Sequence, residues 1–480
     1  MEAEDFFQDH DTEALDDNER HKLVSVFRKL THQEIEAEKL KSMQPLVRFP
    51  KECLEINPET DRYVKEYLEF PKRPIWNYTM SKEEVEQHEQ EAFDHWMQSM
   101  EERYGESNQL SWYERNLEVW RQLWRVLEIS DVLLIVMDIR NPLLHFSRSL
   151  YHYITQELKR KIIGVFNKVD LVSDFTVFAW KKYFEEEFPE IQIATFSCFP
   201  RDPQLIDDTA TFALKKQAKR PKKRYYYAQG VKEILSLCRD MVDKPDVTVD
   251  WKSIIAQYDK DETNKQQHDK DDSDSSDDDE SDDESDTGSM DGLDDTFGHF
   301  LEITGEEIKP HKNYITLGLV GHPNVGKSSL INSIMQRTVV STSKTPGHTK
   351  HFQTIHIAKN VRLCDSPGLV FPALIPRSLQ ILSGMYPIAQ VQEPYSSIRY
   401  LAERIPLEKI LGLTPPINYD EMNDPDYYLL NATSETSAKN PNDYPWSAWS
   451  ILEAFGDQRG FHIAKTPAPD VYRGNVLLDV

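Results

Sequence analysis

The nine residues GHPNVGKSS, which begin at Gly321, constrain the fold of this chain more than any other stretch. They contain the spacing GxxxxGKS. The apolar run YITLGLV (314–320) leads directly into them, and the following segment, SSLINSIMQR, is typical of a helix. A strand, a glycine-rich turn and a helix in this order direct backbone N–H groups and a helix N-terminus toward one point, where a phosphate group can bind. The stretch therefore predicts a phosphate-binding loop.

Two side chains of this loop carry its predicted chemistry. Lys327 is expected to reach the β- and γ-phosphates of a nucleotide, and the Ser328 hydroxyl is expected to bind Mg²⁺. The backbone of the remaining positions would surround the phosphates. This adds to the predicted binding residues Gly321, Asn324, Val325, Gly326 and Ser329.

Two later segments fit the switch loops of a nucleotide site. DSPG (365–368) ends a predicted strand, so Asp365 would bind Mg²⁺ and the Gly368 N–H would sense the γ-phosphate. Between the two motifs, SKTPGHTKH (343–351) offers Thr345 and Thr349 as the switch threonine that binds Mg²⁺. Thr349 is preferred because it follows the flexible pair Pro-Gly; the alternative is an ordinary polar loop.

A base-reading motif comes earlier in the chain. In NKVD (167–170), Asp170 can accept from N1–H and the N2 amino group of guanine, Asn167 can bond another polar edge, and the stem of Lys168 can cover the ring. Ser197 and Cys198 are the predicted turn that supports the base. ETSAK (435–439) is the alternative, disfavoured because no NKxD lies between DSPG and it.

Apolar segments predict a parallel sheet around these motifs. The predicted strands are 131–138, 161–166, 192–197 and 314–320, with helical segments between them. Residues 112–130 predict a helix with one apolar face, and 354–358 with 361–365 predict a hairpin-like strand pair. The motifs then run base, base support, phosphate, switch, switch. The predicted fold is an α/β P-loop domain in which the base-reading half comes first, a circular permutation of the small-GTPase order.

Charge and polarity divide the chain into five predicted parts. Residues 269–295 hold fifteen acids and one lysine, which cannot bury enough apolar surface to order them. The predicted parts are a helical N-terminal extension (1–110), the first half of the permuted domain (111–245), an acidic disordered linker (246–312), the second half (313–385) and a mostly helical C-terminal domain (386–480).

Composition excludes several functional classes. The net charge of −26 disfavours indiscriminate nucleic-acid binding, and no apolar run is long enough to span a membrane. Four scattered cysteines predict neither a disulfide framework nor a zinc site. The basic run 214–227 is read either as a contact for rRNA phosphates or a nuclear localisation signal, or as a solvated loop. Serines within 273–285 suit acid-directed phosphorylation or a plain spacer.

The motif order NKVD, SC, GHPNVGKSS, TPGHT and DSPG, with DIRNP (138–142) upstream, resembles the circularly permuted GTPases of the YlqF/YawG branch. The resemblance implies a switch that hydrolyses GTP to GDP, with Mg²⁺, in large ribosomal subunit biogenesis. It implies a pre-60S particle or rRNA as partner, and potassium held by Asn324. We expect a monomer that acts in the cytoplasm, the nucleus or both. The acidic start differs from the basic, nucleolus-targeting arm of many relatives.

Leu369 leaves two alternative functions open. It stands where small GTPases have a catalytic glutamine, so the water-orienting amide is missing. One alternative is therefore a scaffold that holds GTP or GDP with little hydrolysis. Another is an ATP-using P-loop enzyme in which NKVD is a coincidence.

Overall fold

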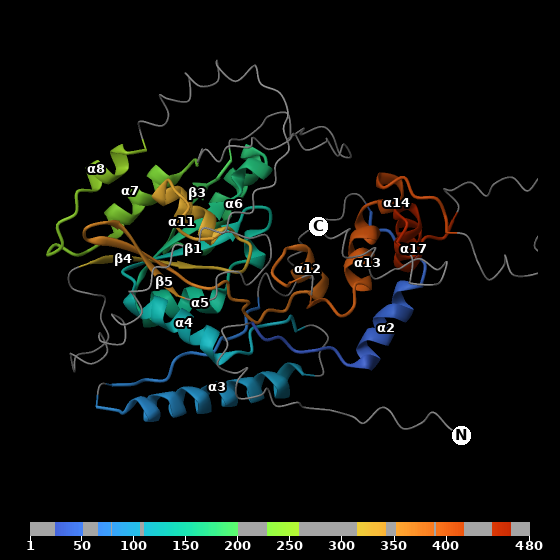
Figure 1. Ribbon diagram of the computed structural model, residues 1–480, viewed down its shortest axis with the longest axis horizontal. Coiled ribbons are helices and arrows are strands. Elements are labelled where there is room, and N and C mark those ends of the chain that lie inside the picture. Colours follow the sequence, from blue (N-terminus) through green and yellow to red (C-terminus); the bar gives the residue numbers. More distant parts are fainter. Residues whose placement is uncertain are drawn as a thin grey trace, which may run out of the picture.

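A six-stranded sheet forms the centre of the protein (Figure 1). The computed structural model describes residues 25–50, 66–77, 79–105, 110–199, 228–258, 314–341, 352–387, 390–416 and 444–461. The strands are β1 (Val132–Asp138), β2 (Lys161–Asn167), β3 (Ile191–Phe196), β4 (Ile315–Val320), β5 (Gln353–Ala358) and β6 (Val361–Asp365). They pair in the order β3-β2-β1-β4-β6-β5, all parallel except β5, which runs antiparallel to β6. The predicted sheet and strand pair are confirmed.

Helices cover both faces of this sheet (Figure 1). One face packs against α4 (Leu117–Ile129), α5 (Arg148–His152) and α6 (Asp174–Glu187), and the other against α7 (Val231–Met241), α8 (Trp251–Ala256) and α11 (Lys327–Met335). Helix α3 (Lys82–Tyr104) lies on the outer side of α4 (Figure 1), where the Trp96 ring of α3 contacts the Trp120 ring of α4. Short turns are η2 (Pro142–Leu144), η3 (Tyr153–Glu157) and η4 (Val169–Leu171). Every residue of β1 is buried because successive side chains alternate between two covered faces. Within the ranges described, none of the helices is long and apolar enough to cross a membrane.

The pairing of β1 with β4 joins the two halves of the permuted domain into one sheet. Strands β1–β3 carry the first half of the predicted domain, and β4–β6 carry the second. Val132 to Ile135 pair in register with Leu317 to Val320, so the two halves share one sheet. A parallel strand is held by its neighbours in the sheet rather than by chain order, so this arrangement survives a change in where the chain begins.

Residues from both ends of the chain build a separate helical module. Helix α2 (His32–Ser42) packs against α13 (Tyr395–Arg404) and α17 (Ala448–Arg459), next to α14 (Leu407–Ile410), as Figure 1 shows. Leu46 N donates to Trp446 O at 2.9 Å, and Arg48 binds Glu408 at 2.7 Å. The described part of the predicted extension 1–110 is thus divided, because α2 joins the C-terminal helices whereas α3 packs on α4 of the sheet domain.

The structure differs from the sequence predictions at two further boundaries. The predicted helix 112–130 begins only at Leu117, where the Asn116 side chain caps it by accepting from Glu118 N at 3.0 Å. The predicted disordered linker 246–312 is wrong at its start, because 246–258 is ordered and contains α8. Ile254 is buried there against α7 and the sheet, and this burial offsets the ordering cost. Residues 259–312 lie outside the described residues.

Candidate nucleotide-binding site

The predicted motifs meet at the carboxyl ends of three adjacent strands. Asp138 ends β1, Asn167 ends β2, and Gly321 follows β4. Since β1 lies between β2 and β4, the NKVD motif and the phosphate loop flank one strand (Figure 1). The crevice outside the carboxyl ends of parallel strands is where open α/β sheets bind ligands.

The phosphate loop has the backbone conformation that its glycines permit. Gly326 has φ +97°, and a Cβ atom there would lie 2.1 Å from Asn167 Nδ2. Lys327 begins α11 with its side chain buried, and its Nζ donates to Gly321 O at 2.9 Å and His322 O at 2.8 Å. Burial lowers the pKa of Lys327 to about 8, opposed by the charge of Asp365. The Lys327 ammonium group is thus held inside the loop that is predicted to bind the phosphates.

The surroundings of Asp365 are those expected of a metal-binding carboxylate. It is fully buried at the end of β6, and neither carboxylate oxygen has a hydrogen-bond partner among the described residues. Burial raises its pKa to about 6, although the charge of Lys327 opposes the shift. Unpartnered buried carboxylate oxygens are the donors that Mg²⁺ prefers. Ser328, the second residue of α11, is the other predicted ligand within the described residues.

The backbone at Gly368 also lies close to the phosphate loop, as expected of a residue that senses the γ-phosphate. A Cβ atom there would lie 2.7 Å from Pro323 Cα, so only glycine allows this contact with the phosphate loop. Thr345 and Thr349 lie outside the described residues, so the switch threonine stays a prediction. The basic run 214–227 and the serines of the acidic run also lie outside.

The NKVD motif makes direct bonds to the phosphate loop. Asn167 Nδ2 donates to Val325 O at 2.6 Å, and Asn167 Oδ1 accepts from Lys168 N at 2.7 Å. Lys168 has φ +65°, and its Nζ donates to Asn324 O at 2.9 Å. Two segments more than 150 positions apart in sequence are therefore joined by two hydrogen bonds.

The predicted base-support residues lie beside Asp170. The Ser197 hydroxyl donates to Asp170 Oδ1 and accepts from Phe199 N at 3.1 Å. Cys198 Sγ lies 3.7 Å from Ser333 Oγ on α11, and burial raises the pKa of its thiol. The alternative support motif at 435–439 lies outside the described residues.

Sequence reasoning assigned no role to Asp138, which the structure places in the site. Its carboxylate is 2.7 Å from Lys168 Nζ and accepts from Arg140 Nε at 3.0 Å and Nη2 at 2.7 Å. The sequence signal was the aspartate of DIRNP at the end of a buried strand. A single acidic residue at a strand end is too common to indicate a site by itself.

A second missed contact joins the phosphate loop to later helices. Asn324 has φ +58°, and its Nδ2 donates to Gly384 O at 2.9 Å, just after α12 (Arg377–Leu382). This orientation directs the amide nitrogen to the carbonyl and leaves Oδ1 as the oxygen that can face a cation.

Together, this sheet order and these motifs define a P-loop GTPase domain with circularly permuted motifs. Residues 316–402 match the family described as 50S ribosome-binding GTPase. The chain is 38% identical over 456 residues to guanine nucleotide-binding protein-like 1 of Macaca fascicularis, covering 94% of this chain and 70% of that protein. It is 29% identical over 423 residues to the large subunit GTPase 1 homolog of Mus musculus, covering 83% and 62%.

A solved GDP-bound structure of TM YlqF aligns with 13% identity and a TM-score of 0.34, covering 75% of this chain and 92% of that one. On the sequence matches, the chain belongs to the guanine nucleotide-binding protein-like 1 family of circularly permuted GTPases.

Proposed function

We propose that this protein binds GTP between NKVD and the phosphate loop and hydrolyses it to GDP and phosphate as a conformational switch in large ribosomal subunit biogenesis. The observation that carries the proposal is the bonding of Asn167 and Lys168 to the carbonyls of Val325 and Asn324. These bonds fix the distance between the base-reading residues and the phosphate-binding backbone. A nucleotide has a flat base at one end and phosphates at the other, and the acceptor pair of Asp170 selects guanine among the bases.

Each predicted residue then has one task. Asp170 accepts from the guanine edge while the Ser197 hydroxyl holds its carboxylate in place. Lys327 leaves the carbonyls of its own loop to contact the β- and γ-phosphates. Mg²⁺, held by Ser328, Asp365 and, as a prediction, Thr349, would neutralise charge that develops on the phosphates. The Gly368 N–H would report the γ-phosphate.

The switch would act on the segment that follows DSPG. Glu114 N donates to Val370 O at 3.0 Å, Ser111 N donates to Ala373 O at 3.0 Å, and Asn324 bonds Gly384. A change at Gly368 or Asn324 therefore reaches the ordered residues before α4 and the turn after α12, and α12 packs against α13 of the helical module. This supports a mechanism in which the nucleotide state moves that module relative to the sheet.

Potassium stimulation is the finer part of the proposal. With Leu369 buried and no glutamine in its place, transition-state charge needs another positive group. Asn324 Oδ1 could bind a potassium ion beside the phosphates. Hydrolysis should be faster in potassium than in sodium, and equal rates would count against this role.

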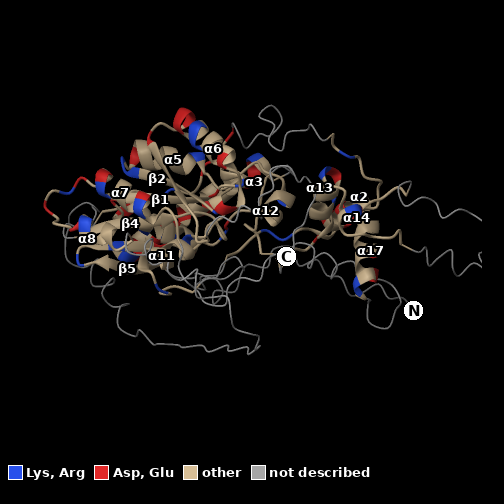
Figure 2. Cartoon of the chain, turned by 90° about the horizontal axis from the view of Figure 1, so that it is seen from above, with Lys and Arg blue, Asp and Glu red and all other residues tan. Residues whose placement is uncertain are grey.

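Large ribosomal subunits are the proposed partner. The description of the matched family and the name of one relative support this assignment. Acidic and basic residues are interspersed over the described elements (Figure 2), so an RNA contact on that part of the chain would be local. We propose a cytoplasmic or nuclear monomer. GTP hydrolysis in potassium buffer, with and without purified large subunits, tests the proposal, and strong stimulation is the expected result.

The second candidate is a GTP- or GDP-holding scaffold. Leu369 favours it, because its side chain packs into the core and only its backbone N–H reaches the phosphate loop, at 3.3 Å from Gly321 O. Single-turnover assays separate the two. GTP that stays intact after long incubation with large subunits, while remaining tightly bound, would support the scaffold.

A further inference from the structure

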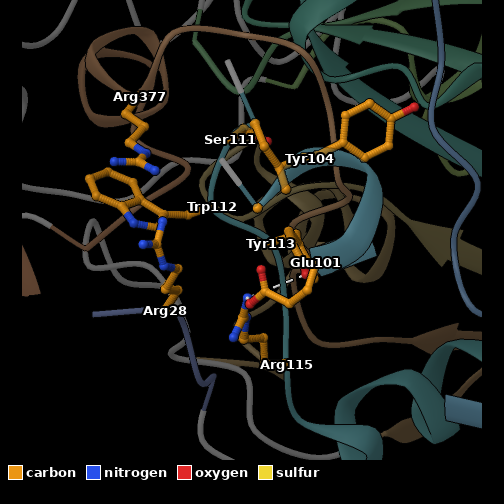
Figure 3. A pocket seen from close by; sticks show the side chains of 10 residues that line it. Arg28, Glu101, Tyr104, Ser111, Trp112, Tyr113, Arg115 and Arg377 are labelled. Carbon is orange, nitrogen blue, oxygen red and sulfur yellow. Dashed lines mark hydrogen bonds and ion pairs between the residues drawn. The ribbon is translucent and has the colours of Figure 1, made fainter. Parts of the chain in front are cut away.

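The segment before α2 connects the helical module to the part of the chain that follows the second switch motif. Residues 25–31, which we call the strap, end at Thr31, the residue that caps α2. Figure 3 shows where the strap meets two other segments, because the Trp112 ring lies between the side chains of Arg28 and Arg377. The Arg377 guanidinium carbon is 5.5 Å from the ring centroid. The strap, the residues before α4 and the start of α12 therefore meet at one place.

Two backbone groups of the strap are bonded to the residues before α4. Val26 N donates to Glu114 Oε1 at 2.9 Å, and Arg115 N donates to Val26 O at 2.9 Å. The Glu114 side chain is fully buried, so removal of the Val26 donor would leave a buried carboxylate short of a partner. Such a loss costs more than the bond itself contributes. These bonds therefore hold the strap and Glu114 together.

Apolar side chains of the strap pack against the chain at and after α12. Leu30 is buried in a cluster with four other side chains, which are Trp112, Ile381, Tyr386 and Val391. The Phe27 ring packs against the same cluster, with its centroid 4.9 Å from that of Tyr386. In addition, Leu30 N donates to Gln392 Oε1 at 2.6 Å. The strap thus holds the segment before α4 and the segment after α12 at the same time.

The residues that the strap holds are bonded in turn to the second switch motif. Glu114 N donates to Val370 O at 3.0 Å, two positions after Gly368. Between them, Leu369 N donates to Gly321 O at 3.3 Å, and the backbone of Gly368 packs closely against the phosphate loop. In this conformation the Gly368 N–H lies where it can meet a γ-phosphate. Only Glu114 and its two bonds separate the strap from the residues that follow this glycine.

We propose that the strap stabilises the GTP-binding conformation of the second switch and couples it to the helical module, an inference that rests on the proposed GTP-dependent switch. Docking of the strap fixes Glu114, and Glu114 fixes the backbone at Val370, so that Gly368 stays beside the phosphate loop. GTP binding and strap docking favour each other, because both stabilise the same conformation. GDP has no γ-phosphate for Gly368 to contact, so its binding gains little from a docked strap.

Equilibrium titrations of GDP and GTPγS into full-length variants test this coupling. Val26→Pro removes the N–H that donates to Glu114, and Val26→Ala is the matched control because it keeps this N–H. Val26→Pro should weaken GTPγS binding about fivefold or more and change GDP binding less than about twofold. Val26→Ala should bind both nucleotides like the wild type. If Val26→Pro fails to fold, Phe27→Ala decides, because it removes only the ring that packs on Tyr386, and the same shift is expected.

Hydrogen exchange of the wild type gives an independent readout. The strap amides should exchange more slowly with GTPγS bound than with GDP bound, since a coupling between two binding events acts in both directions. Equal exchange in the two nucleotide states, or an unchanged ratio of the two affinities in folded Val26→Pro, would overturn the inference and leave GTP binding itself intact. A wild type that binds neither nucleotide would overturn the proposed function and this inference together.

Discussion

Asp138→Asn tests whether one buried carboxylate holds the base-covering lysine in place. The Asp138 side chain is only 3% exposed and lies 2.7 Å from Lys168 Nζ. Burial opposes its ionisation, yet the hydrogen bonds of Arg140 and the charge of Lys168 hold the pKa of Asp138 below its usual range. The carboxylate is therefore ionised throughout the neutral range and anchors both cations.

The two cations contribute unequally. Arg140 is 54% exposed, so its ion pair contributes at most about 1 kcal/mol. Lys168 is 28% exposed, and its charge-assisted hydrogen bond is worth about 1.5–3 kcal/mol. Lys168 keeps its second bond to Asn324 O in the variant, which holds the loss near the lower limit. We expect Asp138→Asn to weaken GDP binding by about 1.5 kcal/mol, or roughly tenfold.

Titration of a fluorescent GDP analogue measures this effect. Arg140→Gln is the control, and we expect it to change the Kd less than about threefold, because only the exposed pair is lost. In a Lys168→Met background, the effect of Asp138→Asn should disappear, since the side chain that it positions has gone. Wild-type affinity in Asp138→Asn, or an equal loss in the Lys168→Met background, would refute the reasoning.

Three other perturbations give distinct outcomes. Burial raises the pKa of Glu114 from 4.5 to about 7, so the folded chain holds a proton that the unfolded chain releases between these values. Stability should therefore fall by about 3 kcal/mol as pH rises through this window, and urea titrations of Glu114→Gln at pH 5 and 8 should show a smaller fall than the wild type. Trp120→Ala removes a fully buried ring and should lower the free energy of unfolding by about 3–5 kcal/mol, measured by the same method. Gly326→Ala places a Cβ against Asn167 Nδ2 and should abolish detectable GDP binding in equilibrium titrations, whereas retained affinity would show that the loop can adjust.

The sheet could be predicted because its strands are continuous apolar runs. VLLIVM and ITLGLV have no helical periodicity, and both are buried on two faces. The strand before the phosphate loop and the helix after it followed from local pattern alone. The motif order then predicted that NKVD and the phosphate loop would meet, and the bond from Asn167 to Val325 joins them.

The remaining features depend on contacts between distant segments. Residues 110–116 lie outside the helix, and Ser111, Trp112 and Glu114 instead hydrogen-bond to residues within 370–380. Helix α2 has no strong apolar face and gains its position from α13 and α17. Such pairings lie hundreds of residues apart in sequence and leave no periodic signal in it.

The central claim is that Asp170 reads the base of a nucleotide whose phosphates lie in the loop after β4. Competition of GTP, XTP and ATP for binding to Asp170→Asn tests it most directly. Xanthine carries a carbonyl where guanine has its amino group, so the amide of the variant can donate where the carboxylate accepted. The account predicts a shift in preference from GTP to XTP, with ATP weak throughout. Unchanged preference for GTP would contradict it.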